Sequence, residues 1–226
     1  LGGGITQINV YFGTNVYSAT GGAYGTDFVI HPDFVLNGQG FGNNDLAVLQ
    51  LDRQITDITP ASLFEGTLTT GMELSMAGFG LPGINSTGYQ AFDGYIRAGT
   101  NTIDGFGGGG FYASWDSDFV FSNFSNIGAA SLEWQASPGD SGGGWFAADG
   151  SLTAVNSFVT GPQTAGTFLG SSTGAINLSN YHPWLNETIA TMAVPEPSSF
   201  MLAGSAAIGL CVYHFRQRTR SRKIAA

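Results

Sequence analysis

Short runs of alternating or mainly apolar residues, separated by glycine-rich turns, fill most of the chain. Residues 5–12 alternate apolar and polar side chains, as a half-buried strand does. Further runs predict strands at residues 27–30, 45–51, 71–80, 89–98, 118–124, 145–147, 152–159 and 174–178. Residues 181–189 have helical spacing, with Trp184, Leu185 and Ile189 on one face. The pattern therefore predicts an all-β fold that closes with one short helix.

Composition agrees with this prediction and limits the function. The 226 residues are enough for one large β domain or two small barrels, and 35 glycines with only 10% charged residues are typical of a turn-rich β protein. The net charge is −9, and Arg53 and Arg97 are the only basic side chains before residue 196. Such an acidic body argues against nucleic-acid binding, which relies on basic patches.

The chain has little chemistry that points to a cofactor. Cys211 is the single cysteine, so no intrachain disulfide can form. Aspartates and glutamates are scattered along the chain and do not cluster at metal-ligand spacings. We therefore expect no metal site and no organic cofactor.

The most specific motif is Ser-Pro-Gly-Asp-Ser-Gly-Gly-Gly at residues 137–144. It places the hydroxyl of Ser141 in a glycine-rich turn, next to Asp140 and in front of the predicted strand 145–147. A nucleophilic serine needs an exposed oxygen and nearby backbone N–H groups that bind the oxyanion formed on attack. Glycines allow such a sharp turn and a close approach to substrate. An ordinary surface turn is the alternative, but the ordered string favours a catalytic loop.

This string resembles the active-site serine segment of the chymotrypsin/trypsin-like serine endopeptidases, a bacterial and disulfide-free member in this case. The resemblance implies that Ser141 is the nucleophile and that the N–H groups of Gly139 and Ser141 form the oxyanion hole. It also implies that Asp140 is the carboxylate that pairs with the amino terminus exposed on activation.

A second stretch carries the same resemblance. Ile-His-Pro at residues 30–32, a loop, and then Asn-Asp-Leu-Ala-Val-Leu-Gln-Leu at 44–51 are similar to the family segment with the triad aspartate. Asp45 would then orient the catalytic histidine and stabilise its charged form. Alone, Asp45 would be a carboxylate at the start of a strand; its order relative to Ser141 favours the catalytic role.

The run at 152–159 resembles the family strand that binds the substrate backbone by β-augmentation. The resemblance implies that Ser157, Phe158 and Val159 line the primary specificity pocket and that Gln135 forms its base. Because Gln135 is neutral, a preference for Arg or Lys substrates is not supported. We expect a protein or peptide substrate with an apolar or small side chain at this position.

The general base of the triad is the difficulty. The three histidines are His31, His182 and His214, and none follows the family's usual small-residue segment. In the family the histidine precedes the aspartate. The chain begins with Leu1, so we expect an N-terminally truncated fragment whose triad histidine lies upstream. The first barrel would be incomplete, and the 226 residues by themselves would be inactive or nearly so.

The last part of the chain has a different character. Residues 198–215 are mostly apolar, near the lower limit of the ~17–25 residues that span a bilayer, and five cations follow in 216–223. Val-Pro-Glu-Pro at 194–197 followed by these segments resembles the PEP-CTERM sorting signal. That resemblance implies export, inner-membrane anchoring through residues 198–215, processing by an exosortase, and release to the cell surface or medium. A permanent anchor is the alternative.

Together these patterns predict an all-β fold of two packed Greek-key six-stranded barrels, the first incomplete, then a short helix and a transmembrane helix. The expected domains are a partial first barrel at 1–62, a second barrel with the closing helix at 63–193, and the sorting signal at 194–226. The expected function is exported serine endopeptidase activity through an acyl-enzyme. The alternatives are a non-catalytic surface- or matrix-binding pseudoprotease on the same scaffold, and an unrelated β-sandwich with a chance motif.

Overall fold

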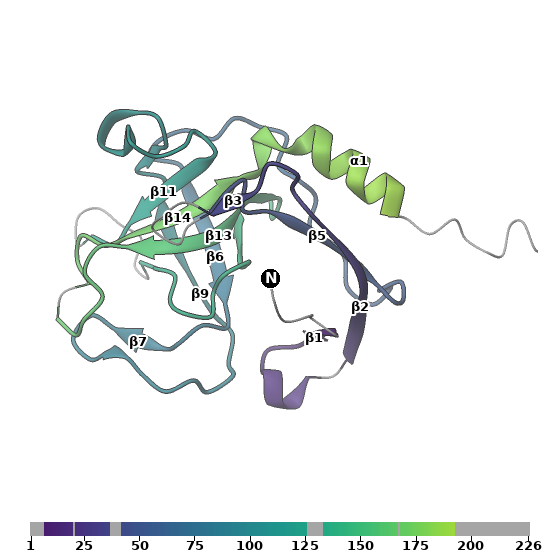
Figure 1. Cartoon of the computed structure of the whole chain (residues 1–226). Coiled ribbons are helices and arrows are strands. Elements are labelled where there is room, and N and C mark those ends of the chain that lie inside the picture. Colours follow the sequence, from purple (N-terminus) through teal and green to yellow (C-terminus); the bar gives the residue numbers. More distant parts are fainter. Residues whose placement is uncertain (1–6, 20, 37–41, 126–132, 167, 193–226) are drawn as a thin grey trace, which may run out of the picture. The chain divides into compact units, whose positions relative to one another are not determined.

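The computed structural model describes residues 7–19, 21–36, 42–125, 133–166 and 168–192 (Figure 1). The strands are β1 (Ile8–Phe12), β2 (Gly21–Ile30), β3 (Val35–Leu36), β4 (Gly42–Asn43), β5 (Ala47–Leu51), β6 (Glu73–Gly78), β7 (Gly83–Ile84), β8 (Gly88–Tyr89), β9 (Arg97–Thr102), β10 (Gly105–Phe106), β11 (Phe119–Asn123), β12 (Gly144–Phe146), β13 (Leu152–Thr160) and β14 (Ser172–Asn177). The helices are η1 (Val16–Ser18), η2 (Gly110–Tyr112), η3 (Leu178–Asn180) and α1 (His182–Met192).

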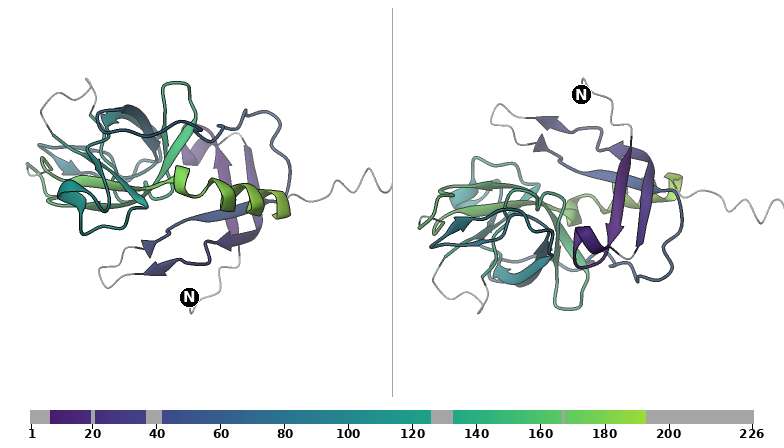
Figure 2. Two further views of the ribbon diagram at one scale, coloured as in Figure 1. Left: turned by 90° about the horizontal axis from the view of Figure 1, so that it is seen from above. Right: turned by 90° about the horizontal axis from the view of Figure 1, so that it is seen from below.

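The first part of the chain forms a three-stranded antiparallel sheet in the order β1-β2-β5. Figure 2 shows these strands in purple and dark blue. A bulge lies between Gly25 and Asp27 of β2. A Cβ at Gly25 would lie 2.6 Å from Leu49 Cδ1, so glycine lets the two strands approach closely here.

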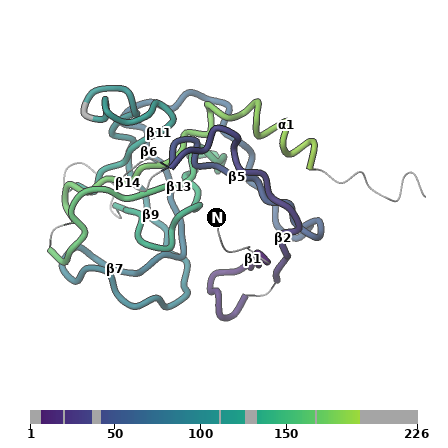
Figure 3. Tube along the Cα trace, in the orientation of Figure 1, coloured from purple at the N-terminus to yellow at the C-terminus, as the bar shows by residue number. Residues whose placement is uncertain are grey.

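The later part of the chain forms a seven-stranded antiparallel sheet in the order β10-β11-β14-β13-β12-β6-β9. The backbone passes from the first sheet to the second through residues 52–72 (Figure 3). In the pairing of β13 with β14, Asn156 faces Ala175 and Phe158 faces Gly174, so Ser157 is the extra residue of a β-bulge. Bulges change the direction of side chains and are frequent next to active sites.

Two apolar clusters pack against this sheet because neighbouring residues of a strand point to opposite faces. On β11, Phe119 and Phe121 belong to one cluster and Val120 to the other, and all three are fully buried. The first cluster also holds Leu46, which directly follows Asp45. The second holds Trp145, four residues after Ser141. Both predicted catalytic segments are therefore fixed to the core by a buried neighbour.

The structure confirms most predicted strands and corrects two details. The strand predicted at 89–98 is wrong: β8 ends at Tyr89 and β9 begins at Arg97. Gly94 between them has φ +78°, a left-handed conformation that interrupts a strand. The helix is present as α1, but Ile189 is 51% exposed, whereas Leu185 and Thr188 are buried. The part of the run at residues 5–6 lies outside the described residues.

The described residues up to Thr188 form one compact unit, and Ile189–Met192 belong to a second. Within the described ranges, no helix is long and apolar enough to cross a membrane. The predicted spanning segment, residues 198–215, lies outside those ranges. The all-β class with one short C-terminal helix is confirmed, whereas the closure into six-stranded barrels and the domain boundaries stay predictions.

We expect Phe121→Ala to lower the free energy of unfolding by about 3–5 kcal/mol, because it opens a cavity in the first cluster. Phe121 is 0% exposed and its ring stacks on Tyr112 with centroids 4.0 Å apart. The matched control is Phe28→Ala, since Phe28 is 44% exposed; it should cost less than about 1.5 kcal/mol. Urea unfolding measures both, and equal losses would contradict the assignment of the core.

Candidate active site

The segment around Ser141 is a pair of tight turns that leaves the serine exposed. The N–H of Asp140 donates to the carbonyl of Ser137 at 2.9 Å, and the N–H of Gly143 donates to the carbonyl of Asp140 at 2.9 Å. Gly139 has φ +100° and Gly142 has φ +82°, so the turns use backbone conformations that favour glycine. Two of the four glycines of the motif therefore have a conformational reason.

Two backbone N–H groups beside Ser141 have no partner within the described residues, those of Gly139 and Ser141. The carbonyls on the same peptide groups are occupied. The carbonyl of Pro138 accepts from the Leu81 N–H at 3.0 Å, and that of Asp140 accepts from Gly143. A trans peptide points its N–H away from its C=O. Both N–H groups are therefore available to an anion.

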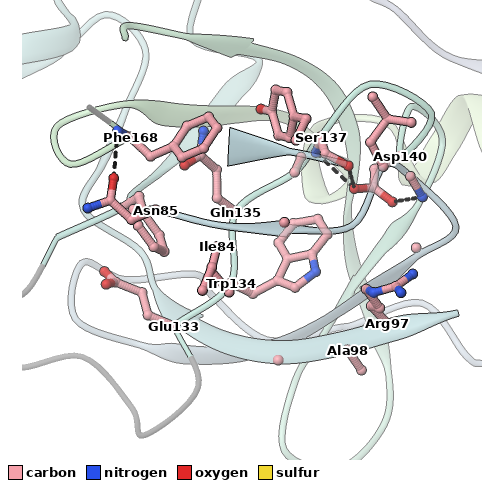
Figure 4. A pocket seen from close by; sticks show the side chains of 18 residues that line it. Ile84, Asn85, Arg97, Ala98, Glu133, Trp134, Gln135, Ser137, Asp140 and Phe168 are labelled. Carbon is pink, nitrogen blue, oxygen red and sulfur yellow. Dashed lines mark hydrogen bonds between the residues drawn. The ribbon is translucent and has the colours of Figure 1, made fainter. Parts of the chain in front are cut away.

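Asp140 is buried, with 5% of its surface exposed, and its carboxylate binds the residues around the turn. Its Oδ1 accepts from the Gly80 N–H at 2.7 Å, and its Oδ2 accepts from the Ser137 N–H at 2.8 Å and from Ser137 Oγ at 2.9 Å (Figure 4). Buried carboxylates need such donors to offset the loss of hydration. A Cβ at Gly80 would lie 2.6 Å from Asp140 Cγ, so only glycine fits there.

Strand β13 links the two predicted catalytic residues. Asp45 Oδ2 accepts from Ser157 Oγ at 2.6 Å, although the two residues are 112 positions apart. On the adjoining residue, the Asn156 carbonyl accepts from the Gly142 N–H and the Asn156 N–H donates to the Gly143 carbonyl, both at 2.9 Å. Consecutive residues of one strand thus bind the Asp45 carboxylate and the turn that carries Ser141.

The segment before Asp45 is held by its neighbour Asn44. Asn44 has φ +53°, which asparagine tolerates better than most residues. Its Nδ2 donates to the Asp33 carbonyl at 3.0 Å, and its Oδ1 accepts from the Tyr181 hydroxyl at 3.0 Å. Burial raises the pKa of Tyr181, with a smaller contribution from Asp118, so the hydroxyl keeps the proton that it donates.

The histidines of the described residues lie in other surroundings. The His31 ring packs against Tyr181 and Trp184, with centroids 5.1 and 4.8 Å apart. His182 Nδ1 lies 3.8 Å from a Glu65 oxygen. Within the described part of the chain, neither histidine forms a hydrogen bond or ion pair with Asp45 or Ser141. His214 lies outside the described residues.

Two cavities lie beside the turn. The smaller, of about 130 Å³, is lined by Ser141 together with three predicted substrate-binding residues, Ser157, Phe158 and Val159. The larger, of about 340 Å³, is lined by Asp140 and by Gln135, the predicted pocket base (Figure 4). The structure therefore does not bring Gln135 into the cavity of Ser141, and its assignment as pocket base stays a prediction.

A comparison with family models decides the affiliation of this chain. The model described as Trypsin matches residues 2–185. The chain belongs to the trypsin family. A second model, the PEP-CTERM protein-sorting motif, matches residues 193–218, so the trypsin-family domain carries a C-terminal sorting signal. A comparison with curated proteins finds no match.

The wall of the larger cavity also contains Arg97, whose guanidinium is engaged elsewhere. It donates to the two carboxylate oxygens of Asp93 at 2.9 and 2.6 Å. The hydrogen bonds from Arg97 lower the pKa of Asp93 to about 2. Within the described residues, all three hydrogen-bond donors to the Asp140 carboxylate are uncharged. In this trypsin-family chain, the buried carboxylate is thus held by peptide and hydroxyl groups.

Sequence reasoning assigned no role to three residues that build the site. Ser137 lies inside the motif at 137–144 and Gly80 ends the run 71–80, but neither pattern indicates that the residue binds the Asp140 carboxylate. Asn156 was detectable, because it is a polar residue that follows Ala154 and Val155 in an apolar run. Within the described residues, no group of three or more histidine, cysteine or acidic side chains is placed to hold a metal.

We expect Gly80→Ala to destabilise the protein by about 1–3 kcal/mol, because the new methyl group collides with Asp140 and Ser137. Gly109→Ala is the control, since its nearest heavy atom would be 3.7 Å away and its φ is −135°. Thermal and urea unfolding compare the two variants. A Gly80→Ala protein as stable as the Gly109→Ala protein would argue against a buried, tightly enclosed Asp140.

Proposed function

We propose that this trypsin-family protein is an exported serine endopeptidase in which Ser141 forms an acyl-enzyme. The observation that carries the proposal is the convergence on β13: Ser157 binds the Asp45 carboxylate, and Asn156 binds the turn of Ser141. The N–H groups of Gly139 and Ser141, which have no partner among the described residues, would supply the oxyanion site that such a serine needs.

In the proposed mechanism, Ser141 Oγ attacks the carbonyl carbon of the scissile peptide and loses its proton to a histidine base. The N–H groups of Gly139 and Ser141 bind the resulting oxyanion. The histidine then protonates the leaving amine, which leaves an ester on Ser141. The same histidine then deprotonates a water molecule, whose oxygen attacks the ester carbon. When the bond to Ser141 Oγ breaks, the histidine gives the proton to Ser141 Oγ and the carboxylic acid product leaves.

The histidine is proposed to come from outside the described residues. The Asp45 carboxylate has an oxygen that could accept a hydrogen bond from this histidine. Its Oδ2 is occupied by Ser157, whereas its Oδ1 accepts no hydrogen bond within the described part of the chain. Asp45 would hold the imidazole in the tautomer that accepts the serine proton and would stabilise the imidazolium.

The substrate is proposed to be an extended polypeptide. β12 pairs with β13 only as far as Val155, so no strand of the described part of the chain pairs with residues 157–159 on that side. Backbone groups there can pair with a peptide strand. The adjacent cavity of about 130 Å³ suits a small or apolar side chain. Gln135 would set the base of this pocket only if it turned toward it.

Export is proposed from the sorting motif at 193–218. Residues 198–215 would hold the precursor in the inner membrane, and an exosortase would process it near Pro195-Glu196-Pro197. The mature protein would then reach the cell surface or the medium. We also propose that residues 1–62 and 63–193 correspond to the two barrels of the family, with 194–226 as a separate signal.

One observation favours a second candidate function. His31 and His182, the two described histidines, are engaged with aromatic rings and with Glu65 and not with Asp45. A chain without any other histidine base would be a pseudoprotease that binds surface or matrix components.

A fluorophosphonate probe separates the two functions, because it reacts with an activated serine hydroxyl and releases fluoride. We expect the natural full-length protein to be labelled and the label to disappear in Ser141→Ala. Ser86→Ala, which removes an exposed serine far along the chain from the motif, should be labelled like the wild type. An unlabelled wild-type protein that is folded would support the pseudoprotease.

Asp45→Asn should lower kcat by roughly 10³- to 10⁴-fold with little change in KM, because the histidine would then adopt the wrong tautomer. Ser157→Ala leaves the carboxylate in place and removes one of its hydrogen bonds, so we expect a loss of at most about tenfold. Steady-state hydrolysis of a peptide substrate measures both. Similar losses for the two variants would contradict the role of Asp45.

A further inference from the structure

Asn156 is 5% exposed and makes four hydrogen bonds, all to the segment 140–145. Its backbone binds Gly142 and Gly143. Its side-chain Oδ1 accepts from Trp145 Nε1 at 2.6 Å, and its Nδ2 donates to the Asp140 carbonyl at 3.1 Å. We propose that Asn156 is a positioning residue that sets the oxyanion hole by fixing the peptide group between Asp140 and Ser141. This inference rests on the proposed peptidase function.

The chemistry of Trp145 fixes the orientation of the amide. An indole nitrogen can only donate, so the Asn156 atom that faces it must be the oxygen. The other end of the amide is then the NH₂ group, which can only donate. It faces the Asp140 carbonyl, which can only accept. Both ends of the amide are therefore matched, and a flipped amide would leave two buried groups facing the wrong partner.

The held carbonyl determines where the Ser141 N–H points. The Asp140–Ser141 peptide is planar, so its C=O and N–H point in opposite directions. The C=O receives the Gly143 N–H at 2.9 Å and Asn156 Nδ2 at 3.1 Å on the interior side. The Ser141 N–H consequently faces away from Asn156, in the direction where it has no partner within the described residues.

The Asn156 amide is a second donor to the Asp140 carbonyl, in addition to the Gly143 N–H, in a turn whose neighbouring glycines allow rotation. Gly139 and Gly142 flank the Asp140–Ser141 peptide, and glycine has the largest backbone freedom of all residues. The Asp140 side chain is held by Gly80 and Ser137, which fixes the residue on the other side of its Cα. Asn156 thus holds the backbone carbonyl of Asp140, while Gly80 and Ser137 hold its side chain.

The role predicts a particular kinetic signature. The Ser141 N–H binds the oxygen more strongly when it carries the negative charge of the transition state than when it is the carbonyl of the substrate. Loss of its orientation should therefore lower kcat and leave KM nearly unchanged. A purely structural role would lower stability without this selective loss.

The test compares Asn156→Leu, which removes both amide interactions, with Asn156→Asp, which keeps an acceptor for Trp145 but places an oxygen against the Asp140 carbonyl. In the natural full-length protein, each variant should lower kcat about 10- to 100-fold and change KM less than about threefold. Each should also lower the affinity for a peptidyl trifluoromethyl ketone by the same factor as kcat/KM. This inhibitor forms a tetrahedral oxyanion on the serine.

Thr153→Val is the matched control. Thr153 is also buried on β13, and its Oγ1 donates to the Trp145 carbonyl at 2.9 Å. This variant should lower the melting temperature and keep kcat within about twofold of the wild type. Equal effects of Thr153→Val and Asn156→Leu on kcat would overturn the inference.

Folded Asn156 variants with kcat within about threefold of the wild type would also overturn it. If neither variant folds, a crystal structure of the wild-type protein with the ketone decides. An oxyanion about 2.7–3.1 Å from Ser141 N, with Asn156 Nδ2 on the Asp140 carbonyl, supports the role. An oxyanion beyond about 3.5 Å, or Asn156 bound elsewhere, refutes it.

A folded wild-type protein that neither turns over substrate nor binds the ketone refutes the proposed function itself, before Asn156 is varied.

Discussion

The bulge of β13 is the constraint on which the site depends. A regular strand would point consecutive side chains to opposite faces of the sheet. Because Ser157 is an extra residue in the pairing with β14, Asn156 binds the turn of Ser141 while Ser157 binds Asp45. Two segments that are distant in the sequence are therefore connected through adjoining residues of one buried strand.

The packing below the bulge keeps it in this form. Phe158 follows Ser157 and packs with Phe119 and Phe121 in the first cluster. Gly174, opposite Phe158, has no side chain, and its position is filled by the Phe158 ring. Movement of the bulge would therefore disturb the core as well as the site. In this way the packed sheet fixes the positions of site residues that lie on turns.

The buried Asp140 shows how the turn is held from the other side. Three neutral donors surround its carboxylate, and two of them come from Ser137. Because Ala136 and Ser137 line both cavities, the segment before Ser141 forms a wall between them. The Asp140–Ser141 peptide group thus lies between the buried Asp140 carboxylate and the side-chain amide of Asn156.

The sequence by itself determined what depends on local patterns. An alternating pattern predicted β1, and mainly apolar runs predicted β6, β11 and β13. The ordered string at 137–144 identified the turn of Ser141, because turns and strands follow from neighbouring residues. The strand predicted at 89–98 failed because Gly94, a single left-handed residue, outweighed the apolar pattern around it.

Only the tertiary structure decided which distant residues meet. The sequence placed Asp45 and Ser157 in separate motifs, whereas their hydrogen bond requires the bulge register of β13 and the buried anchor of Leu46. Gly80, Ser137 and Asn156 became part of the site for the same reason. Their partners are set by long-range strand pairing and by the burial of polar groups that must find donors or acceptors, and neither is encoded in a local stretch of residues.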